Sequence, residues 1–240
     1  MIEQTTNKII DNNAIPQSFF DQNLKEIPVQ PEEWKKYVQQ RTEKLAQTEN
    51  DEDKLNLLAQ LGYASRVLMK LNEAESYLIQ ALTLSFYHPD KTKLIQNAIR
   101  LAHVYQWQKN FAKAHLLFDL AKMILNEESV SDGLSAFYHQ HLGKFYFDQG
   151  FVRLAQHEFE LAFKIRMRMN ADTELLNSTQ HCLDMVKKLN NDNKDSEVII
   201  RRAEVADAEA IHRAHMKSIN EICVQDHTAE EYHDAELEQP

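Results

Sequence analysis

The sequence is poor in turn-forming residues, because only 4 glycines and 5 prolines occur among its 240 residues. This scarcity disfavours an all-β fold and any fold built on glycine-rich loops, and it favours helices. The sequence also lacks an apolar run near the roughly 20 residues that cross a bilayer, so no membrane contact is expected. The first residues show no basic segment followed by an apolar one, which is the pattern of a signal peptide.

Cysteine and basic charge are scarce as well. The 2 cysteines, Cys182 and Cys223, lie in different segments, which is typical of reduced thiols and predicts a cytoplasmic protein. The net charge is -10, and residues 204–240 carry most of it, with ten acidic side chains against Arg213 and Lys217. Because binding to phosphates needs a basic surface, this distribution argues against nucleic acid as the partner.

A pattern with a period of 40 to 41 residues occurs three times in the middle of the chain. Each copy begins with a leucine and a small residue and continues with an alanine, a large apolar residue and a second alanine. The small residues let two antiparallel helices approach closely, and the large residue fills the space opposite. The three copies are Leu61, Gly62, Ala74, Leu78 and Ala81; Leu101, Ala102, Ala114, Phe118 and Ala121; and Leu142, Gly143, Ala155, Phe159 and Ala162.

This pattern resembles the tetratricopeptide repeat (TPR), in which Leu-Gly, Tyr, Ala-x-x-x-Phe and Ala follow one another. The resemblance covers residues 54–189 and implies an all-α fold, a TPR-like α-solenoid of antiparallel helix pairs. The period exceeds the family's usual 34 residues and is similar to the long-repeat class. The family's closing proline is absent from all three copies, which leaves the angle between repeats open. The repeats are expected at 54–88, 94–128 and 135–170, followed by a capping helix at 173–189.

Two further segments precede the repeats. Pro31, Glu32 and Glu33 predict a helix start, because proline suits the first turn and acidic side chains suit the positive end of the helix dipole. The helical region is therefore expected over residues 31–190. Residues 1–30 show weak periodicity and many Asn and Gln residues, and we predict a flexible N-terminal arm there.

The TPR resemblance implies a concave groove, lined by the first helix of each pair, that binds a protein or a peptide without catalysis or cofactor. The mixture of aromatic, amide and cationic side chains suits an extended peptide or a partner helix. Its larger aromatic members could equally belong to the core between repeats. The predicted peptide-binding groove consists of Asn56, Tyr63, Arg66, Gln96, His103, Gln106, Trp107, Phe137, Gln140, Lys144, Phe147, Asp148, His181 and Lys188.

Side chains that could support chemistry do not fall at useful spacings. His139 and His141 point about 200° apart on a helix, so they cannot share a metal ion. His181 and the adjacent Cys182 diverge in the same way, which argues against a catalytic pair. No glycine-rich phosphate loop is present. We therefore expect no enzyme activity, no metal and no cofactor.

The stretch "SEVIIRRAEVADAEAIHRAHMKSI" near the end of the chain has a different character. It resembles the start of the GNAT acetyltransferases, with a strand that ends in Ile200-Arg201-Arg202-Ala203 and a helix opened by Asp207 and Ala208. The resemblance covers residues 197–240 and implies a short strand and helix from an incomplete, acidic fragment.

The GNAT family binds acetyl-CoA through a glycine-containing loop at a helix N-terminus, an anion site of the usual kind. No glycine follows Gly150, so the fragment is not expected to catalyse acetyl transfer. Three functions are left open. The favoured one is a protein-binding scaffold, and the alternatives are the N-terminal recruiting part of a truncated GNAT acyltransferase and a scaffold that self-associates as a homodimer.

Overall fold

A computed structural model describes residues 14–127, 131–192, 207–209 and 211–213 of the chain. The chain divides into two compact units, Met1–Lys194 and Asp195–Pro240. In the second unit only residues 207–209 and 211–213 are described, and they are helical. The expected strand at 198–200 and nearly all of the GNAT-like fragment therefore lie outside the described residues.

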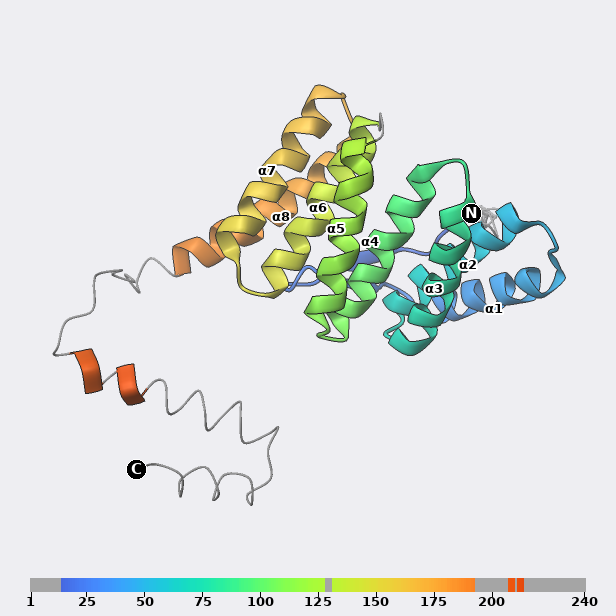
Figure 1. Cartoon of the computed structure of the whole chain (residues 1–240), viewed down its shortest axis with the longest axis horizontal. Coiled ribbons are helices and arrows are strands. Elements are labelled where there is room, and N and C mark those ends of the chain that lie inside the picture. The colour runs from blue at the N-terminus through green and yellow to red at the C-terminus, as the bar shows by residue number, and fades with distance from the viewer. Residues whose placement is uncertain (1–13, 128–130, 193–206, 210, 214–240) are drawn as a thin grey trace, which may run out of the picture. The chain divides into compact units, whose positions relative to one another are not determined.

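The first unit consists of a small hairpin followed by helices that pack against their neighbours in sequence order, as antiparallel pairs (Figure 1). This confirms the all-α, TPR-like fold class. Among the helices that the structure describes, none combines the length and the apolar character that a membrane span needs. The elements are β1 (Ser18–Phe20), β2 (Glu26–Pro28), α1 (Pro31–Gln47), α2 (Asp51–Val67), α3 (Leu71–Tyr87), α4 (Lys91–Trp107), α5 (Phe111–Glu127), α6 (Asp132–Asp148), α7 (Val152–Arg168) and α8 (Thr173–Asp192).

Each pair, α2–α3, α4–α5 and α6–α7, is joined by the same tight turn. The second residue after the first helix has a positive φ, 61° at Met69, 62° at Lys109 and 78° at Gly150. The amide of the next residue then donates to a carbonyl five residues back, for example Lys70 N to Ser65 O at 2.8 Å. This is the Schellman pattern, which satisfies the last carbonyls of a helix and reverses the chain. The common turn explains why all three pairs fold back alike.

Close contact between the helices of a pair depends on the small residues of the repeat. A methyl group added at Gly143 would lie 2.5 Å from Cε1 of Phe159, and one added at Gly62 would collide with the side chain of Leu78. Phe159 and Leu78 are themselves fully buried. The structure therefore confirms that a small residue on the first helix faces the large residue on the second.

Helices α1 and α8 cover the two ends of the repeats. Trp34 and Tyr37 of α1 pack against Ala64 and Val67 of α2. At the other end, Cys182, Leu183 and Val186 of α8 join a cluster that includes Phe159 of α7. The apolar surfaces of the terminal repeats are thereby removed from water, as a solenoid requires.

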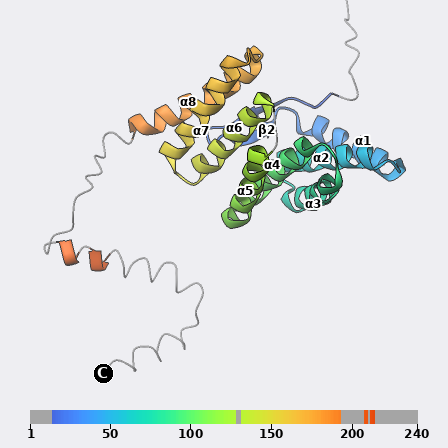
Figure 2. The same ribbon diagram turned by 45° about the horizontal axis from the view of Figure 1, so that its top comes forward.

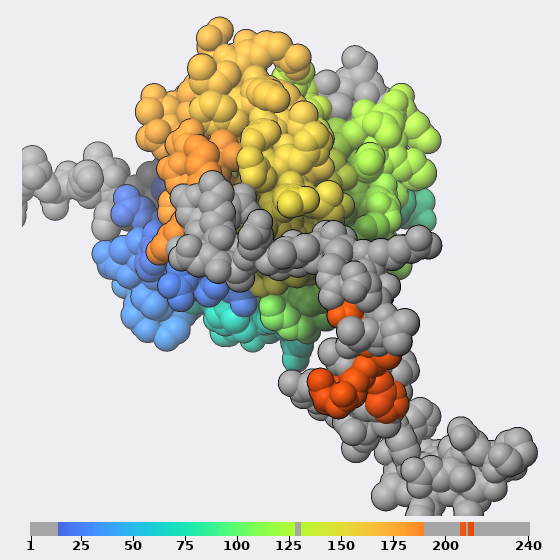
Figure 3. Space-filling model, turned by 90° about the vertical axis from the view of Figure 1, so that its left-hand side faces the viewer, coloured from blue at the N-terminus to red at the C-terminus, as the bar shows by residue number. Residues whose placement is uncertain are grey.

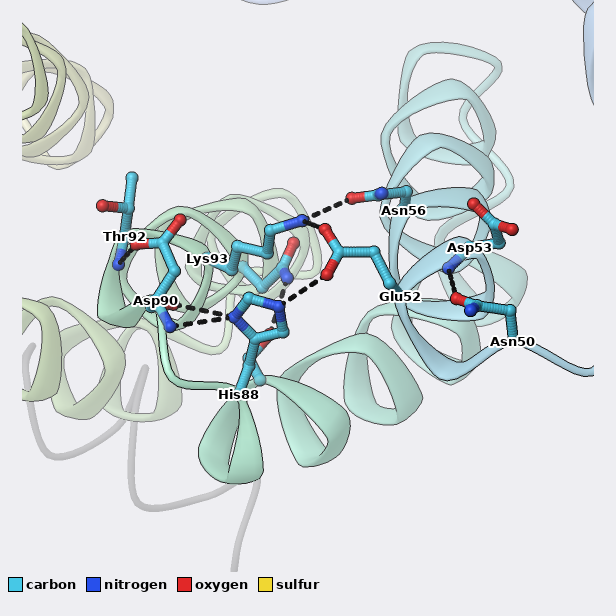
Figure 4. Close-up of polar contacts among 10 residues, drawn as sticks. Asn50, Glu52, Asp53, Asn56, His88, Asp90, Thr92 and Lys93 are labelled. Carbon is cyan, nitrogen blue, oxygen red and sulfur yellow. Dashed lines mark hydrogen bonds and ion pairs between the residues drawn. The ribbon is translucent and has the colours of Figure 1, made fainter.

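A polar network joins the first two repeats where α2 and α4 begin (Figure 4). Glu52 of α2 accepts hydrogen bonds from Lys93 of α4 at 2.5 Å and contacts His88 of the preceding loop at 2.9 Å. These hydrogen bonds lower the pKa of the Glu52 carboxyl to about 2. Asp90 caps α4 by accepting from the Thr92 amide at 2.9 Å. The loop therefore fixes the start of α4 relative to α2.

Candidate binding groove

Residues 14–30 contain a hairpin in the segment where the sequence predicts a flexible arm. Strands β1 and β2 are antiparallel, and Phe20 pairs with Glu26. The turn is closed by the Asp21 carboxylate, which accepts hydrogen bonds from the amides of Asn23 and Lys25, each at 2.8 Å. Short polar residues such as Asp favour turns of this kind. The rest of the expected arm, residues 1–13, lies outside the described residues.

The hairpin lies on the surface formed by α2, α4, α6 and α8, which we call the inner face. Figures 1 and 2 show it beside α4 and α6, on the side of α4 that faces away from α5. Three of its side chains contact three different helices: Glu26 binds Arg66 of α2, Lys25 lies 5.8 Å from the Trp107 ring of α4, and the Phe20 ring lies 3.5 Å from Lys144 of α6. The hairpin thus occupies the surface where the sequence predicts a peptide groove.

An apolar residue and a backbone contact fix the two ends of the hairpin. Leu24, at the turn, is buried among Phe147, Cys182 and Val186. Figure 3 shows the N-terminal part of the described chain, in dark blue, against the orange α8. Near the start of β1, the carbonyl of Gln17 accepts a hydrogen bond of 3.0 Å from the Trp34 indole. The hairpin is therefore held by packing at one end and by a hydrogen bond at the other.

Glu26 is the centre of the polar contacts between hairpin and helices. Its carboxylate accepts hydrogen bonds from Arg66 Nη2 at 2.9 Å, from Ser18 Oγ at 2.7 Å, and from the Tyr63 hydroxyl. Burial alone would raise the pKa of Glu26, but the Arg66 charge and the hydrogen bonds from Tyr63 and Ser18 outweigh it and lower the pKa below 4.5. Glu26 is therefore ionised while the hairpin is docked.

A cavity of about 510 Å³ lies between the hairpin and the inner face. The hairpin segment contributes Ile15, Phe20 and Glu26, and the helices contribute a mixture of cationic, amide and apolar side chains. Members of the predicted groove that line it are Asn56, Tyr63, Arg66, Gln96, His103, Phe137, Gln140 and Lys144.

The remaining predicted residues lie elsewhere. Trp107 is buried and faces Lys25 and Arg66, while Phe147 belongs to the apolar cluster around Leu24. The side chain of Gln106 hydrogen-bonds to the ring of His103. Asp148 forms an ion pair of 3.0 Å with Lys109, at the ends of α6 and α4. His181 and Lys188 are exposed on α8, and neither lines the cavity.

The cavity also contains side chains that the sequence did not indicate. Arg166 comes from α7, a second helix of a pair, whereas we expected only first helices to contribute. It donates to the Leu175 carbonyl at 2.8 Å and to Gln140 and Thr179. Arg100 of α4 lies one turn before the predicted His103 and was omitted from the predicted groove. The hairpin residues were missed because their partners are about 40 positions away in the chain.

His103, which is buried, and His141, which is half-buried, form a pair that lines the cavity, with His103 Nε2 and His141 Nδ1 2.5 Å apart. Burial, followed by the charges of Arg66 and Lys144, holds the pKa of His103 well below 6.5; burial, the neighbouring imidazole and the same two charges do so for His141. Both rings are therefore neutral at physiological pH. The described residues contain no group of three or more His, Cys, Asp and Glu side chains that could hold a metal ion.

No family model matches the chain, and no curated protein matches it. Among solved structures, the chain is similar to BtubC (BKLC) from P. vanneervenii, with 14% sequence identity and a TM-score of 0.45. The match covers 72% of this chain and 84% of that chain. The helix pairs described above, and not this likeness, define the fold.

Proposed function

We propose that the inner face binds an extended segment of a protein partner in the place that residues 14–30 occupy. One observation carries this proposal: the chain's own hairpin is held there by an ion pair to α2, a cation–π contact to α6 and an apolar anchor among residues of α6 and α8. A surface that binds one extended segment through such contacts can bind another that presents the same groups. In this role the protein is a scaffold without catalysis of its own.

The proposal predicts that the inner face accepts a peptide once the hairpin is released. Replacing Glu26 by lysine in the full chain places a cation against Arg66 and should expel the hairpin, because two like charges cannot share a buried site. A fluorescent peptide of residues 14–30 should then bind this variant more tightly than it binds the wild type. Fluorescence anisotropy measures both affinities.

The matched control is the same peptide with lysine in place of Glu26. It should bind the variant poorly, and adding Trp107→Ala and Lys144→Ala to the variant should weaken binding of the original peptide. Equal binding of both peptides, or no binding to a variant whose circular dichroism is native, would refute the groove. A second copy of the chain carries the same hairpin, so light scattering of the variant also reports self-association.

The GNAT resemblance of residues 197–240 favours a second candidate, in which the repeats recruit substrate proteins to an acyltransferase. The residues that carry it, Ile200 to Ala203, lie outside the described part of the chain. Sequencing the gene past Pro240 tests this candidate. A downstream, in-frame, glycine-rich loop would favour the acyltransferase, and its absence would leave the scaffold.

A further inference from the structure

The charges around the cavity between the hairpin and the inner face do not balance. Its lining contains four cationic side chains, Arg66, Arg100, Lys144 and Arg166, and one carboxylate, Glu26. Glu26 is already bound to Arg66. The cavity therefore has an excess of three positive charges, and partly buried charges of one sign attract a counter-ion.

Lys144 shows this excess most clearly. Its side chain is only 5% exposed, and its ammonium group lies over the Phe20 ring. No carboxylate or other hydrogen-bond acceptor contacts the ammonium group among the residues that the structure describes. An ammonium group has three donors. Among the described residues Ser65 Oγ is the one fully enclosed side-chain N or O atom without a partner, so the Lys144 ammonium group is open to the cavity and its donors can meet an anion there. Burial lowers the pKa of Lys144, and the charges of Arg66 and Arg166 act in the same direction against the opposing effects of Cys182 and Glu26.

Two further arginines line the same cavity and keep donors that make no hydrogen bond within the described residues. Arg166 donates to Gln140, the Leu175 carbonyl and Thr179 from Nη1 alone, which leaves Nη2 and Nε. Arg100 donates one hydrogen bond, from Nη1 to the Asn97 amide oxygen at 3.0 Å. A guanidinium group has five N–H donors in a planar fork, which suits two oxygens of one anion. The cations come from α2, α4, α6 and α7, so their charges converge on the cavity from several directions.

The size and walls of the cavity limit what can enter it. A volume of about 510 Å³ falls within the range of about 300–1,000 Å³ that is usual for small-molecule sites. Phe137, Ile99 and Leu175 give it an apolar side, and Gln96 and Ser178 add neutral polar groups. Because the hairpin covers part of the inner face, a long peptide could not enter without displacing it.

We propose that this cavity binds a small organic anion, a carboxylate or a phosphate, through Lys144 and the guanidinium groups of Arg100 and Arg166. The ligand fits while the hairpin is docked, so this site goes beyond the binding of a protein segment and does not depend on it. Its apolar part would lie against Phe137, and its charged group would face Lys144.

Isothermal titration calorimetry with the full chain tests the site. Citrate is the carboxylate probe and inorganic phosphate is the phosphate probe, each compared with sodium chloride at matched ionic strength. We expect at least one probe to bind the wild type, and the tighter of the two identifies the ligand chemistry. Lys144→Met keeps an unbranched side chain of similar length and removes the charge, and it should weaken binding at least about tenfold.

Lys113→Met is the matched control, because the Lys113 ammonium also lies over an aromatic ring, 5.0 Å from the centre of Tyr105, but outside the cavity. It should bind the probes as the wild type does. Arg100→Gln is a second cavity variant, used should circular dichroism show that Lys144→Met is not folded. Failure of both probes to bind the wild type, or equal binding by the cavity variants and the control, would overturn the proposal.

Discussion

Replacing Glu26 by glutamine should release the hairpin from the inner face. In the wild type, the carboxylate and its partner Arg66 are almost fully buried, with side-chain exposures of 11% and 8%. Glutamine has nearly the same shape but no charge, so Arg66 would remain buried without a counter-charge. The Tyr63 hydroxyl and Ser18 would also lose a charged acceptor.

The size of the effect follows from how the chain can respond. Removing one partner of a buried ion pair typically costs about 3–5 kcal/mol, because the other charge is left unpaired. Undocking of residues 14–30 exposes Arg66 to water and avoids that cost. The stability lost in the variant therefore cannot exceed the free energy of docking. A loss of about 3 kcal/mol would raise the undocked population roughly 100-fold, at about 1.4 kcal/mol per factor of ten.

Hydrogen exchange of the hairpin amides measures this population. The amides of Asp21 and Val29 donate hydrogen bonds within the hairpin, to Lys25 O at 2.9 Å and Gln17 O at 3.0 Å, and should exchange faster in the variant. The control is Glu32→Gln, which makes the same chemical change at an exposed ion pair with Lys35. Unchanged exchange of the hairpin amides in Glu26→Gln would refute the reasoning.

Three further predictions follow from the same structure. The pKa of Glu26 is lowered in the docked state, so the hairpin amides should be fully protected above about pH 4.5. Protection should be lost as the pH falls through the pKa that Glu26 has in the docked state. Glu26→Gln should show no such pH dependence. Gly143→Ala should lower the free energy of unfolding by about 1–3 kcal/mol in a urea titration, because its methyl group would press on the buried Phe159 ring; no change would contradict the close contact. Asp90→Ala should cost about 0.5–2 kcal/mol by the same measurement, because the Thr92 amide loses its cap, whereas Asp90→Asn should cost less.

The helices could be predicted from the sequence because their causes are local and repeated. Leucine, a small residue and two alanines recur at constant spacing, and Gly143 meets Phe159 as the pattern requires. The hairpin has no such signal, since each strand has three residues and its binding contacts span long distances along the chain. Glu26 gains its importance from Arg66, 40 residues later, and nothing in the neighbourhood of Glu26 indicates that partner.

The residues of the candidate groove divide in the same way, into those that the repeat predicts and those that depend on contacts between distant parts of the chain. Tyr63, Arg66, His103 and Lys144 were predicted because first helices face inward in a regular array of pairs. Arg166 was not predicted, because its place in the cavity depends on how far the end of α7 reaches toward α8. There the Arg166 side chain donates to the Leu175 carbonyl. Periodicity therefore predicts which face a residue occupies along one helix, but not which end of a neighbouring helix reaches that face.

The hairpin also changes how the repeats depend on one another. In a solenoid each repeat contacts its neighbours, so stability is close to a sum of local terms. Here Glu26 binds α2, Lys25 lies over a ring of α4, and Leu24 packs among residues of α6 and α8. One short segment therefore contacts the first and the last repeat at once. A partner segment or a substitution at Glu26 that displaces the hairpin removes contacts from both ends of the array together. Binding at the inner face and the stability of the repeats are therefore coupled.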